Sequence, residues 1–329
     1  MTSALRSLAA AGVHLAARGL ARRRLSILMY HRVLEWPDPI NTWDVTRDAF
    51  DTQMRELAAH FAPLALGEAV ERLARNALPP GAVCVTFDDG YADNLTAAVP
   101  ILRRHGIPAT FFIATAYLNG GRMWNDTVVE AIRAADGERI ELGGIGLGTL
   151  PLGCPAARRA TIERILAGIK HRAPEAREDA ARLIVEQVGK PLPADLMLTD
   201  AQLLSLRRSG MEIGAHTATH PILANLPPAA AQAEIVSGRE RLVELLREPV
   251  RLFAYPNGKP RLDYAWEHVQ MVRAAGFVAA VSTADGVAGP AADAFQLPRQ
   301  APWDRNPVTF SLRLARSYRG TISDQVVPA

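Results

Sequence analysis

The stretch Val83-Cys84-Val85-Thr86-Phe87-Asp88-Asp89-Gly90 decides how the rest of the chain is interpreted. Its run of apolar and β-branched residues predicts a buried strand that delivers two adjacent carboxylates to a glycine turn. Two neighbouring carboxylates repel each other unless a cation or a shared proton lies between them. Asp88 and Asp89 therefore indicate either a metal site or an acid/base pair. The alternative is a strand followed by an ordinary Asx turn.

The composition is typical of a globular protein with a sizeable core. Of the 329 residues, 49% are hydrophobic and 22% are charged, and the length suits one large domain or two ordinary ones. The formal net charge is +3, almost all of the positive charge is arginine, and no dense basic block is interleaved with aromatic residues. We therefore expect no nucleic-acid partner. Cys84 and Cys154 have no metal or redox spacing, so no disulfide framework is expected.

Residues 1–24 are interpreted as an N-terminal amphipathic helix or leader. The mildly apolar run from Leu8 to Ala17 is interrupted by His14 and followed by arginines, so it is too short and too polar to span a membrane. It also lacks the charge distribution and cleavage region of a secretory signal. We expect peripheral contact with an anionic membrane surface, and a frayed leading helix is the alternative. The expected location is cytoplasmic, peripheral to the inner membrane, with the periplasm as the alternative.

Apolar runs at regular intervals predict strands that alternate with amphipathic helices. The predicted strands cover residues 25–30, 83–87, 109–114, 211–215, 251–255 and 277–281, with 295–299 as a last edge strand. One example of the helical spacing between them is the series Phe50, Met54, Leu57 and Phe61. Such alternation predicts a parallel sheet or a barrel. We place the main domain at residues 25–310 and a C-terminal tail at 311–329.

Residues from 119 to about 200 break the alternation. A helix is expected to begin at Trp124-Asn125-Asp126, a glycine-rich patch covers residues 143–148, and a second amphipathic helix contains Ile162 and Ile165. Because the strand–helix alternation resumes afterwards, this region is predicted to be a helical insertion and not an independent domain.

The segment His216-Thr217-Ala218-Thr219-His220 follows directly after a predicted strand. Two histidines four residues apart can bind one metal ion, and the alternative is one solvent-facing and one packed histidine. Position favours the metal, because both histidines and the Asp88-Asp89 pair lie at C-terminal strand ends, where such enzymes assemble their sites. Two imidazoles and one carboxylate leave a divalent cation with open positions, and the second carboxylate is then available as a general base.

A leaving amine would need a proton from one further acid. His31 is the best candidate, because it also follows directly from a predicted strand and its ordinary pKa class suits proton transfer. The alternative is a structural histidine at a strand end.

Three segments together carry a resemblance to a known family. Thr86-Phe87-Asp88-Asp89-Gly90, His216-Thr217-Ala218-Thr219-His220 and Phe253-Ala254-Tyr255-Pro256-Asn257-Gly258 resemble the polysaccharide deacetylases (NodB homology, carbohydrate esterase family 4) over roughly residues 26–300. The resemblance implies a distorted (β/α) barrel of about seven strands. It implies Asp88 as the catalytic base, Asp89, His216 and His220 as ligands of a divalent metal, commonly zinc, and an N-acetylated glycan that loses acetate.

The chain departs from the family pattern at two places. In the third segment, Ala254 stands where an arginine usually orients the base, and Arg251 and Arg299 are candidates to replace it. Asn257 stands where a tyrosine usually offers a backbone N–H to the oxyanion, and it can supply the same group beside Tyr255 and Pro256. The usual late strand ending in histidine is absent, and Tyr30-His31 resembles the early Tyr-His motif of a branch with rearranged strand order.

The leading hypothesis is thus a metal-dependent N-deacetylase acting on a polymeric, oligomeric or lipid-linked amino sugar. Trp124 is a candidate sugar-stacking residue, and the alternative for it is a packing anchor. Two other functions stay open: a non-catalytic carbohydrate-binding protein on the same fold, and another metal-dependent amide hydrolase.

Overall fold

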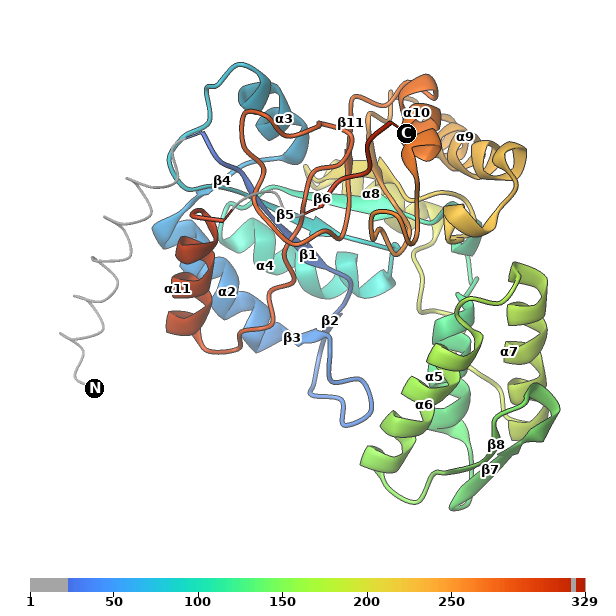
Figure 1. The fold of residues 1–329 in the computed structure, drawn as a ribbon. Helices are drawn as coiled ribbons and strands as arrows, with labels where there is room; N and C mark the ends of the chain where they lie inside the picture. The colour runs from blue at the N-terminus through green and yellow to red at the C-terminus, as the bar shows by residue number, and fades with distance from the viewer. Residues whose placement is uncertain (1–22, 321–323, 329) are drawn as a thin grey trace, which may run out of the picture.

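Parallel strands form the central sheet of the protein in the computed structural model, which describes residues 23–320 and 324–328 (Figure 1). The seven strands of this sheet are β1 (Ser26–Tyr30), β4 (Ala62–Pro63), β5 (Ala82–Phe87), β6 (Ala109–Ile113), β9 (Glu212–Ala215), β10 (Leu252–Ala254) and β11 (Ala279–Val281). Their order is β1-β5-β6-β9-β10-β11, with the short β4 beside β5. Six of the strands coincide with predicted ones, whereas β4 was not predicted.

Residues 297–300 bring the two edges of the sheet together. Leu297 pairs with Val281 of β11, and Gln300 pairs with Leu28 of β1, both in parallel register. This segment was predicted as a last edge strand, and it instead bridges both edge strands without forming a regular strand. The result is the distorted (β/α) barrel that was expected, closed by irregular backbone on one side.

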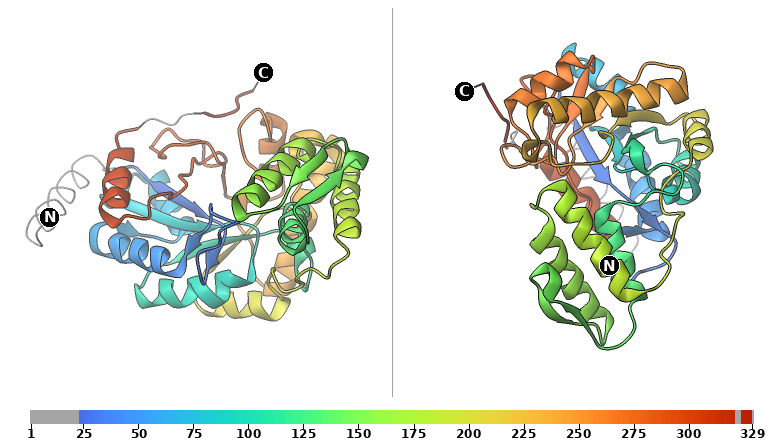
Figure 2. Two further views of the ribbon diagram at one scale, coloured as in Figure 1. Left: turned by 90° about the horizontal axis from the view of Figure 1, so that it is seen from below. Right: turned by 90° about the vertical axis from the view of Figure 1, so that its right-hand side faces the viewer.

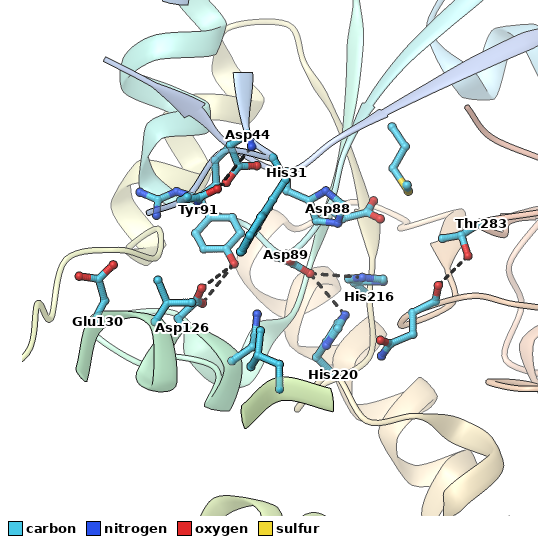
Figure 3. A pocket seen from close by; sticks show the side chains of 18 of the residues that line it. His31, Asp44, Asp88, Asp89, Tyr91, Asp126, Glu130, His216, His220 and Thr283 are labelled. Carbon is cyan, nitrogen blue, oxygen red and sulfur yellow. Dashed lines mark hydrogen bonds and ion pairs between the residues drawn. The ribbon is translucent and has the colours of Figure 1, made fainter. Parts of the chain in front are cut away.

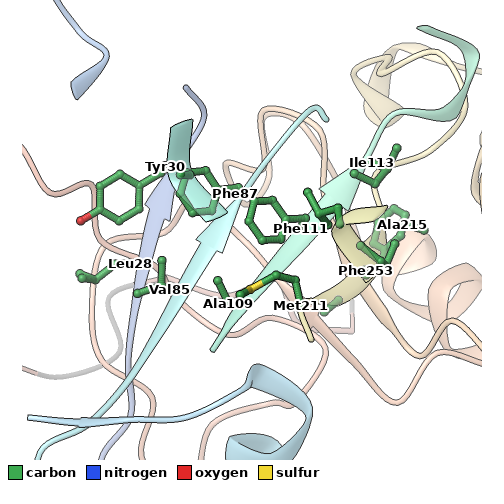
Figure 4. Close-up of a cluster of buried hydrophobic side chains, with 14 of the residues drawn as sticks. Leu28, Tyr30, Val85, Phe87, Ala109, Phe111, Ile113, Met211, Ala215 and Phe253 are labelled. Carbon is green, nitrogen blue, oxygen red and sulfur yellow. The ribbon is translucent and has the colours of Figure 1, made fainter. Parts of the chain in front are cut away.

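Side chains that alternate along the strands form two cores. One face of the sheet carries a row of aromatic rings, in which Phe87 stacks on Tyr30 and on Phe111 with ring centroids 5.4 Å and 4.7 Å apart (Figure 4). This face packs against the surrounding helices. The opposite face carries smaller residues such as Cys84 and Ala254 and belongs to a second core cluster. Because Asp88 has the same parity as Cys84 along the chain, it continues this second, inner face.

Helices surround the sheet (Figures 1 and 2). They are α2 (Arg47–His60), α3 (Leu66–Ala74), α4 (Val99–Arg104, after a π-helical turn at Asn94–Ala98), α8 (Asp200–Arg208), α9 (Pro228–Leu246) and α10 (Trp266–Ala274). Short 3₁₀ turns lie at Thr115–Tyr117 and Leu223–Asn225, and β2 (Val33–Leu34) pairs with β3 (Val45–Thr46). Thr199 caps α8 as predicted, because its hydroxyl accepts from the backbone N–H of Gln202 at 3.2 Å.

The insertion between β6 and β9 forms a lobe beside the barrel (Figure 1). Its elements are α5 (Trp124–Ala134), β7 (Arg139–Leu142), a 3₁₀ turn (Gly143–Ile145), β8 (Gly148–Pro151), α6 (Pro155–Ile169) and α7 (Pro174–Val188). It has its own hydrophobic cluster around residues such as Ile132, Ile165 and Ile184. The insertion is helical as expected, but the glycine-rich patch turns out to lie in an antiparallel hairpin, and α7 was not predicted.

Residues 307–320 and 324–328 pack against the barrel. Helix α11 (Pro307–Ser317) packs on α2, and the Tyr318 hydroxyl donates to the carbonyl of Ala82 at 2.7 Å. Val326 exchanges two hydrogen bonds with the side chain of Gln296. The expected tail boundary at residue 310 is therefore wrong, since it falls inside a helix with a buried face.

The predicted N-terminal helix at residues 1–24 lies almost entirely outside the described residues. Within the described part of the chain, every helix is too short or too polar to cross a bilayer.

Candidate metal and catalytic centre

Three side chains from two strand ends converge at the C-terminal mouth of the barrel. The Asp89 Oδ1 atom lies 3.4 Å from the Nε2 atoms of both His216 and His220 (Figure 3). Ligand atoms that each lie about 2.0–2.1 Å from one tetrahedral ion are themselves about 3.3–3.4 Å apart. The Asp89 oxygen is buried and has no hydrogen-bond partner among the described residues. A buried carboxylate oxygen without a donor fits a cation, so these residues can hold a divalent metal.

The protonation states of Asp89 and His220 also suit a cation. Burial disfavours ionisation of Asp89, but the two histidines outweigh it and hold its pKa below the ordinary value. Burial lowers the pKa of His220 to about 4, so its ring is neutral and can act as a ligand. The Nδ1 atom of His216 lies 2.7 Å from the Ala254 carbonyl, which turns Nε2 towards Asp89.

Residues of the centre adopt unusual backbone conformations. Asp89 (φ 76°), Thr217 (φ 63°), His220 (φ 54°) and Asn257 (φ 59°) all lie in the left-handed region without being glycine. Such conformations cost about 1–3 kcal/mol each and persist only when their surroundings enforce them. The loops that follow β5, β9 and β10 therefore each carry strained backbone at the centre.

Arg299 forms a buried bidentate ion pair with Asp88. Its Nη1 and Nη2 atoms each lie 2.7 Å from one oxygen of the Asp88 carboxylate, and its Nε donates to the Ser282 carbonyl. Of the two arginines proposed from the sequence, Arg299 thus lies beside the candidate base. Arg251 is exposed at the start of β10, at the other end of the barrel.

His31 faces the same cavity as the carboxylates. The cavity measures about 440 Å³ and is lined by His31, Asp88, Asp89, His216 and His220 among others (Figure 3). The His31 carbonyl accepts a hydrogen bond from Asn94, which holds the strand end in place. Tyr30 points the other way into the aromatic core, where its hydroxyl donates to Gln53. The structure therefore brings all five predicted catalytic and metal-binding residues to one cavity.

The residues predicted for oxyanion and substrate binding are separated. Asn257 lines the cavity, and its backbone N–H has no acceptor in the described part of the chain. The Tyr255 ring is buried and stacks on Tyr264 at 4.0 Å, and Pro256 is absent from the cavity lining. Trp124 packs against the insertion's cluster beneath the guanidinium of Arg177, so its position fits the packing alternative.

Several cavity residues were not predicted from the sequence. The next two residues after Trp124, Asn125 and Asp126, line the cavity from the insertion, and the Tyr91 hydroxyl donates to Asp126 at 3.0 Å. The exposed indoles of Trp43 and Trp303 lie at its rim. One indication for Asp126 was present in the sequence, because Asn125 and Asp126 directly follow the tryptophan that begins the helix. Trp43 and Trp303 lie in irregular segments, where no periodic pattern indicates a role.

Comparisons with known proteins agree with this geometry. A family model described as polysaccharide deacetylase matches residues 75–146 and 179–280. The chain is 21% identical over 267 residues to the Bacillus subtilis protein YxkH, covering 80% of this chain and 66% of that protein. It is 30% identical over 112 residues to a poly-beta-1,6-N-acetyl-D-glucosamine N-deacetylase of Staphylococcus epidermidis, covering 30% of this chain and 38% of that one. The chain thus spans two thirds or less of either relative's length.

A solved structure shares the fold. The deacetylase PplD of Streptococcus pyogenes, determined in complex with acetate, superposes with a TM-score of 0.60 at 20% identity. The match covers 90% of this chain and 98% of that one.

Proposed function

The chain belongs to the polysaccharide deacetylase family, and we propose that it is a metal-dependent hydrolase that removes N-acetyl groups from an amino-sugar glycan. The observation that carries the proposal is that the Asp89, His216 and His220 cluster faces the same cavity as Asp88, which Arg299 holds from behind.

Asp89, His216 and His220 would hold the divalent ion, and zinc is the metal we expect from two imidazoles and one carboxylate. When bound, such an ion lowers the pKa of a coordinated water to about 7 and polarises the carbonyl under attack. Three features of the protein prepare the ligand atoms for the ion. Asp89 carries a negative charge, the ring of His220 is neutral, and the Ala254 carbonyl sets the tautomer of His216.

Asp88 would accept the proton of the attacking water. Arg299 holds both carboxylate oxygens in one plane, so the carboxylate cannot rotate away from the cavity. Each oxygen keeps a second lone pair for the water, because the arginine occupies only one lone pair of each. This role leaves Asp88 outside the metal ligand set.

His31 would complete the reaction by protonating the leaving nitrogen. Water adds to the amide carbon and gives one proton to Asp88, the C–N bond breaks, and the amine nitrogen takes a proton from the imidazolium form of His31 while acetate is released. The free backbone N–H of Asn257 would donate to the developing oxyanion.

The cavity suits a sugar polymer or oligomer. Trp43 is 40% and Trp303 is 64% exposed at its rim, and exposed indoles offer flat apolar faces to the C–H face of a pyranose ring. Polar groups from the insertion, including Asp126 and Asn125, line the other wall and can bond sugar hydroxyls.

The test combines metal analysis with an acetate-release screen over N-acetylated amino-sugar oligomers and polymers. Wild-type protein should contain about one equivalent of divalent metal and release acetate. Asp88→Asn should keep the metal and lose at least about 100-fold in rate, an order-of-magnitude expectation for a lost general base. Asp89→Asn should lose the metal, and His31→Ala should keep the metal and lose turnover.

Two results would redirect the proposal. A wild type that binds metal and sugar but releases no acetate from any amino sugar would be a non-catalytic carbohydrate-binding protein. Full turnover by His31→Ala would remove His31 from the mechanism and leave the metal centre in place.

A further inference from the structure

The loop that carries the two metal-binding histidines is strained and needs support from its surroundings. Thr217 and His220 both have left-handed backbone, and Thr217 is β-branched, which makes that conformation especially unfavourable. Inside the loop, the Thr217 hydroxyl accepts from the backbone N–H of His220 at 3.1 Å. The same hydroxyl donates to the His216 carbonyl at 2.6 Å, so both of its bonds stay inside the loop and do not attach it to the barrel.

Glu234 of α9 holds the tip of this loop. Its Oε2 atom accepts from the backbone N–H groups of Ala218 at 3.0 Å and Thr219 at 2.8 Å, and its Oε1 atom accepts from the Thr219 hydroxyl at 2.8 Å. One carboxylate therefore satisfies three donors in two consecutive residues. Hydrogen bonds to an ionised acceptor are shorter and stronger than neutral ones.

Gly238 lies one helical turn after Glu234 on the same face of α9. A Cβ atom at Gly238 would lie 2.5 Å from the carbonyl carbon of Thr217 and 2.6 Å from its oxygen. The missing side chain thus lets the strained residue press against the helix, while Glu234 binds the next two residues. Because Glu234 and Gly238 are four residues apart, they lie on the same face of α9, and the loop of residues 216–220 (the histidine loop) packs on this face.

The opposite side of the loop is held by the segment after β6. The N–H of Ala116 donates to the Ala218 carbonyl at 2.9 Å, and the Tyr117 hydroxyl donates to the Thr219 carbonyl at 2.9 Å. Ala218 and Thr219 are therefore fixed through their N–H groups by α9 and through their carbonyls by this segment. Among the described residues that bond Ala218 and Thr219, Glu234 is the one with a charged side chain.

We propose that Glu234, with Gly238 beside it, is a positioning residue that presets the His216–His220 spacing and so sets the affinity of the centre for its metal. The inference rests on the metal site of the proposed function and not on the identity of the glycan. Outer partners of metal ligands typically contribute about 10–100-fold in metal affinity.

The experiment measures zinc affinity of the full chain by competition with a chromophoric chelator, together with the visible absorption of the cobalt-substituted protein. We expect Glu234→Ala to weaken zinc binding about 10–100-fold and to alter the cobalt spectrum. Glu234→Gln keeps one acceptor oxygen and should lie between Glu234→Ala and wild type. Glu240→Gln, which removes an exposed carboxylate from the same helix, should match wild type.

Gly238→Ala is an independent variant that leaves Glu234 in place. Alanine has the higher helix propensity, but its methyl group would lie 2.5 Å from the carbonyl carbon of Thr217, so the loop has to shift away from α9. We therefore expect weaker zinc binding and an altered cobalt spectrum.

Unfolding of the metal-free proteins in chelator separates positioning from folding. Wild-type zinc affinity and cobalt spectra in both Glu234→Ala and Gly238→Ala would overturn the inference, as would a loss confined to metal-free stability. A wild type that binds no ion would overturn the metal site itself and the inference with it.

Discussion

At the scale of single residues, Arg299 explains how a buried carboxylate can serve as a base. Burial by itself would raise the pKa of Asp88, but the charge of Arg299, helped by His216, outweighs it and keeps the pKa below the ordinary value. The Asp88 side chain is 3% exposed and that of Arg299 is fully buried, so the pair is shielded from solvent screening. Asp88 is consequently ionised and oriented before substrate arrives.

Arg299→Ala should therefore damage both stability and activity. Removing one partner of a buried ion pair costs about 3–5 kcal/mol, because the other charge is left uncompensated. The stability that Asp88 contributes is present above its ordinary pKa and is lost as pH falls through its lowered pKa, and this contribution should disappear. The rate profile should shift to higher pH. Chemical unfolding and pH–rate profiles test this, with exposed Arg251→Ala as the matched control that should behave as wild type.

Asp126 has the opposite electrostatic environment. Burial, followed by the charge of Asp89, raises its pKa to about 7. An acid whose pKa is raised on folding stabilises the protein at low pH, and this contribution is lost as pH rises from its ordinary pKa through about 7. A pKa that differs by one between the folded and the unfolded chain corresponds to about 1.4 kcal/mol of unfolding free energy.

Asp126→Asn should remove this pH dependence in metal-free protein. Between pH 5 and pH 8, wild type should lose unfolding free energy that the asparagine variant retains, so the variant should be the more stable one at pH 8. Urea unfolding in chelator at several pH values measures the difference. The exposed carboxylate of Asp136 in the same insertion provides the control, and equal pH dependence of wild type and Asp126→Asn would contradict the expectation.

At the scale of elements, the inner face of the sheet is packed too closely for ordinary side chains at one point. A Cβ at Gly214 of β9 would lie 2.4 Å from Cδ1 of Phe112 and 3.0 Å from the Leu252 carbonyl oxygen. The glycine lets β9 lie between β6 and β10 with the Phe112 ring across it. Two residues later the same strand delivers His216 to the centre.

Gly214→Ala should destabilise the barrel by about 1–3 kcal/mol, the usual cost of overpacking a core. It should also weaken metal binding, because a shift of β9 moves His216. Gly289→Ala is the control, since no atom lies within 4 Å of the position of its Cβ. Denaturant unfolding and zinc titration of both variants test these expectations. Equal stability of the two variants would contradict close packing as the reason for glycine at position 214.

At the scale of the whole molecule, the cavity is assembled from parts of the chain that are far apart in sequence. The barrel supplies Asp88, Asp89 and the histidines, while the insertion supplies Asp126 and Leu166. The insertion's own hydrophobic cluster holds these residues in place. Metal binding should then depend on the barrel, and glycan binding on both parts.

Ile165→Ala tests this division of roles. Ile165 is fully buried in the insertion's cluster, and its truncation should cost about 2–5 kcal/mol of that core. We expect lower kcat/KM with unchanged zinc affinity, because the neighbouring wall of the cavity loosens while the ligands stay in place. Leu183→Ala, at a 43% exposed position of α7, should change neither quantity. Equal loss of zinc affinity in Ile165→Ala would show that the two parts are not separable.

Local residue patterns were enough to locate the strands at 26–30, 82–87, 109–113, 212–215, 252–254 and 279–281. They also located the polar site residues that follow four of these strands. These were predictable because apolar runs and strand-end polar residues are local, and parallel strands bring their C-terminal ends to one edge. Asp88, Asp89, His216, His220 and His31 accordingly meet at one cavity. The unpredicted β4 has only two residues, and its burial comes from tertiary contacts. Helix α11 was missed although Phe310 and Leu314 have helical spacing, so the pattern for it was present in the sequence.

Only the tertiary structure shows which side chains surround these five site residues. Arg299 and Arg251 were equivalent in the sequence, and closure of the barrel by residues 297–300 places Arg299 on Asp88. Asp126 and Trp303 reach the cavity, and Glu234 reaches the histidine loop, across separations that carry no periodic pattern. Such contacts depend on how strands pair and how the sheet closes, and this long-range geometry is a property of the folded chain that local residue spacing does not encode.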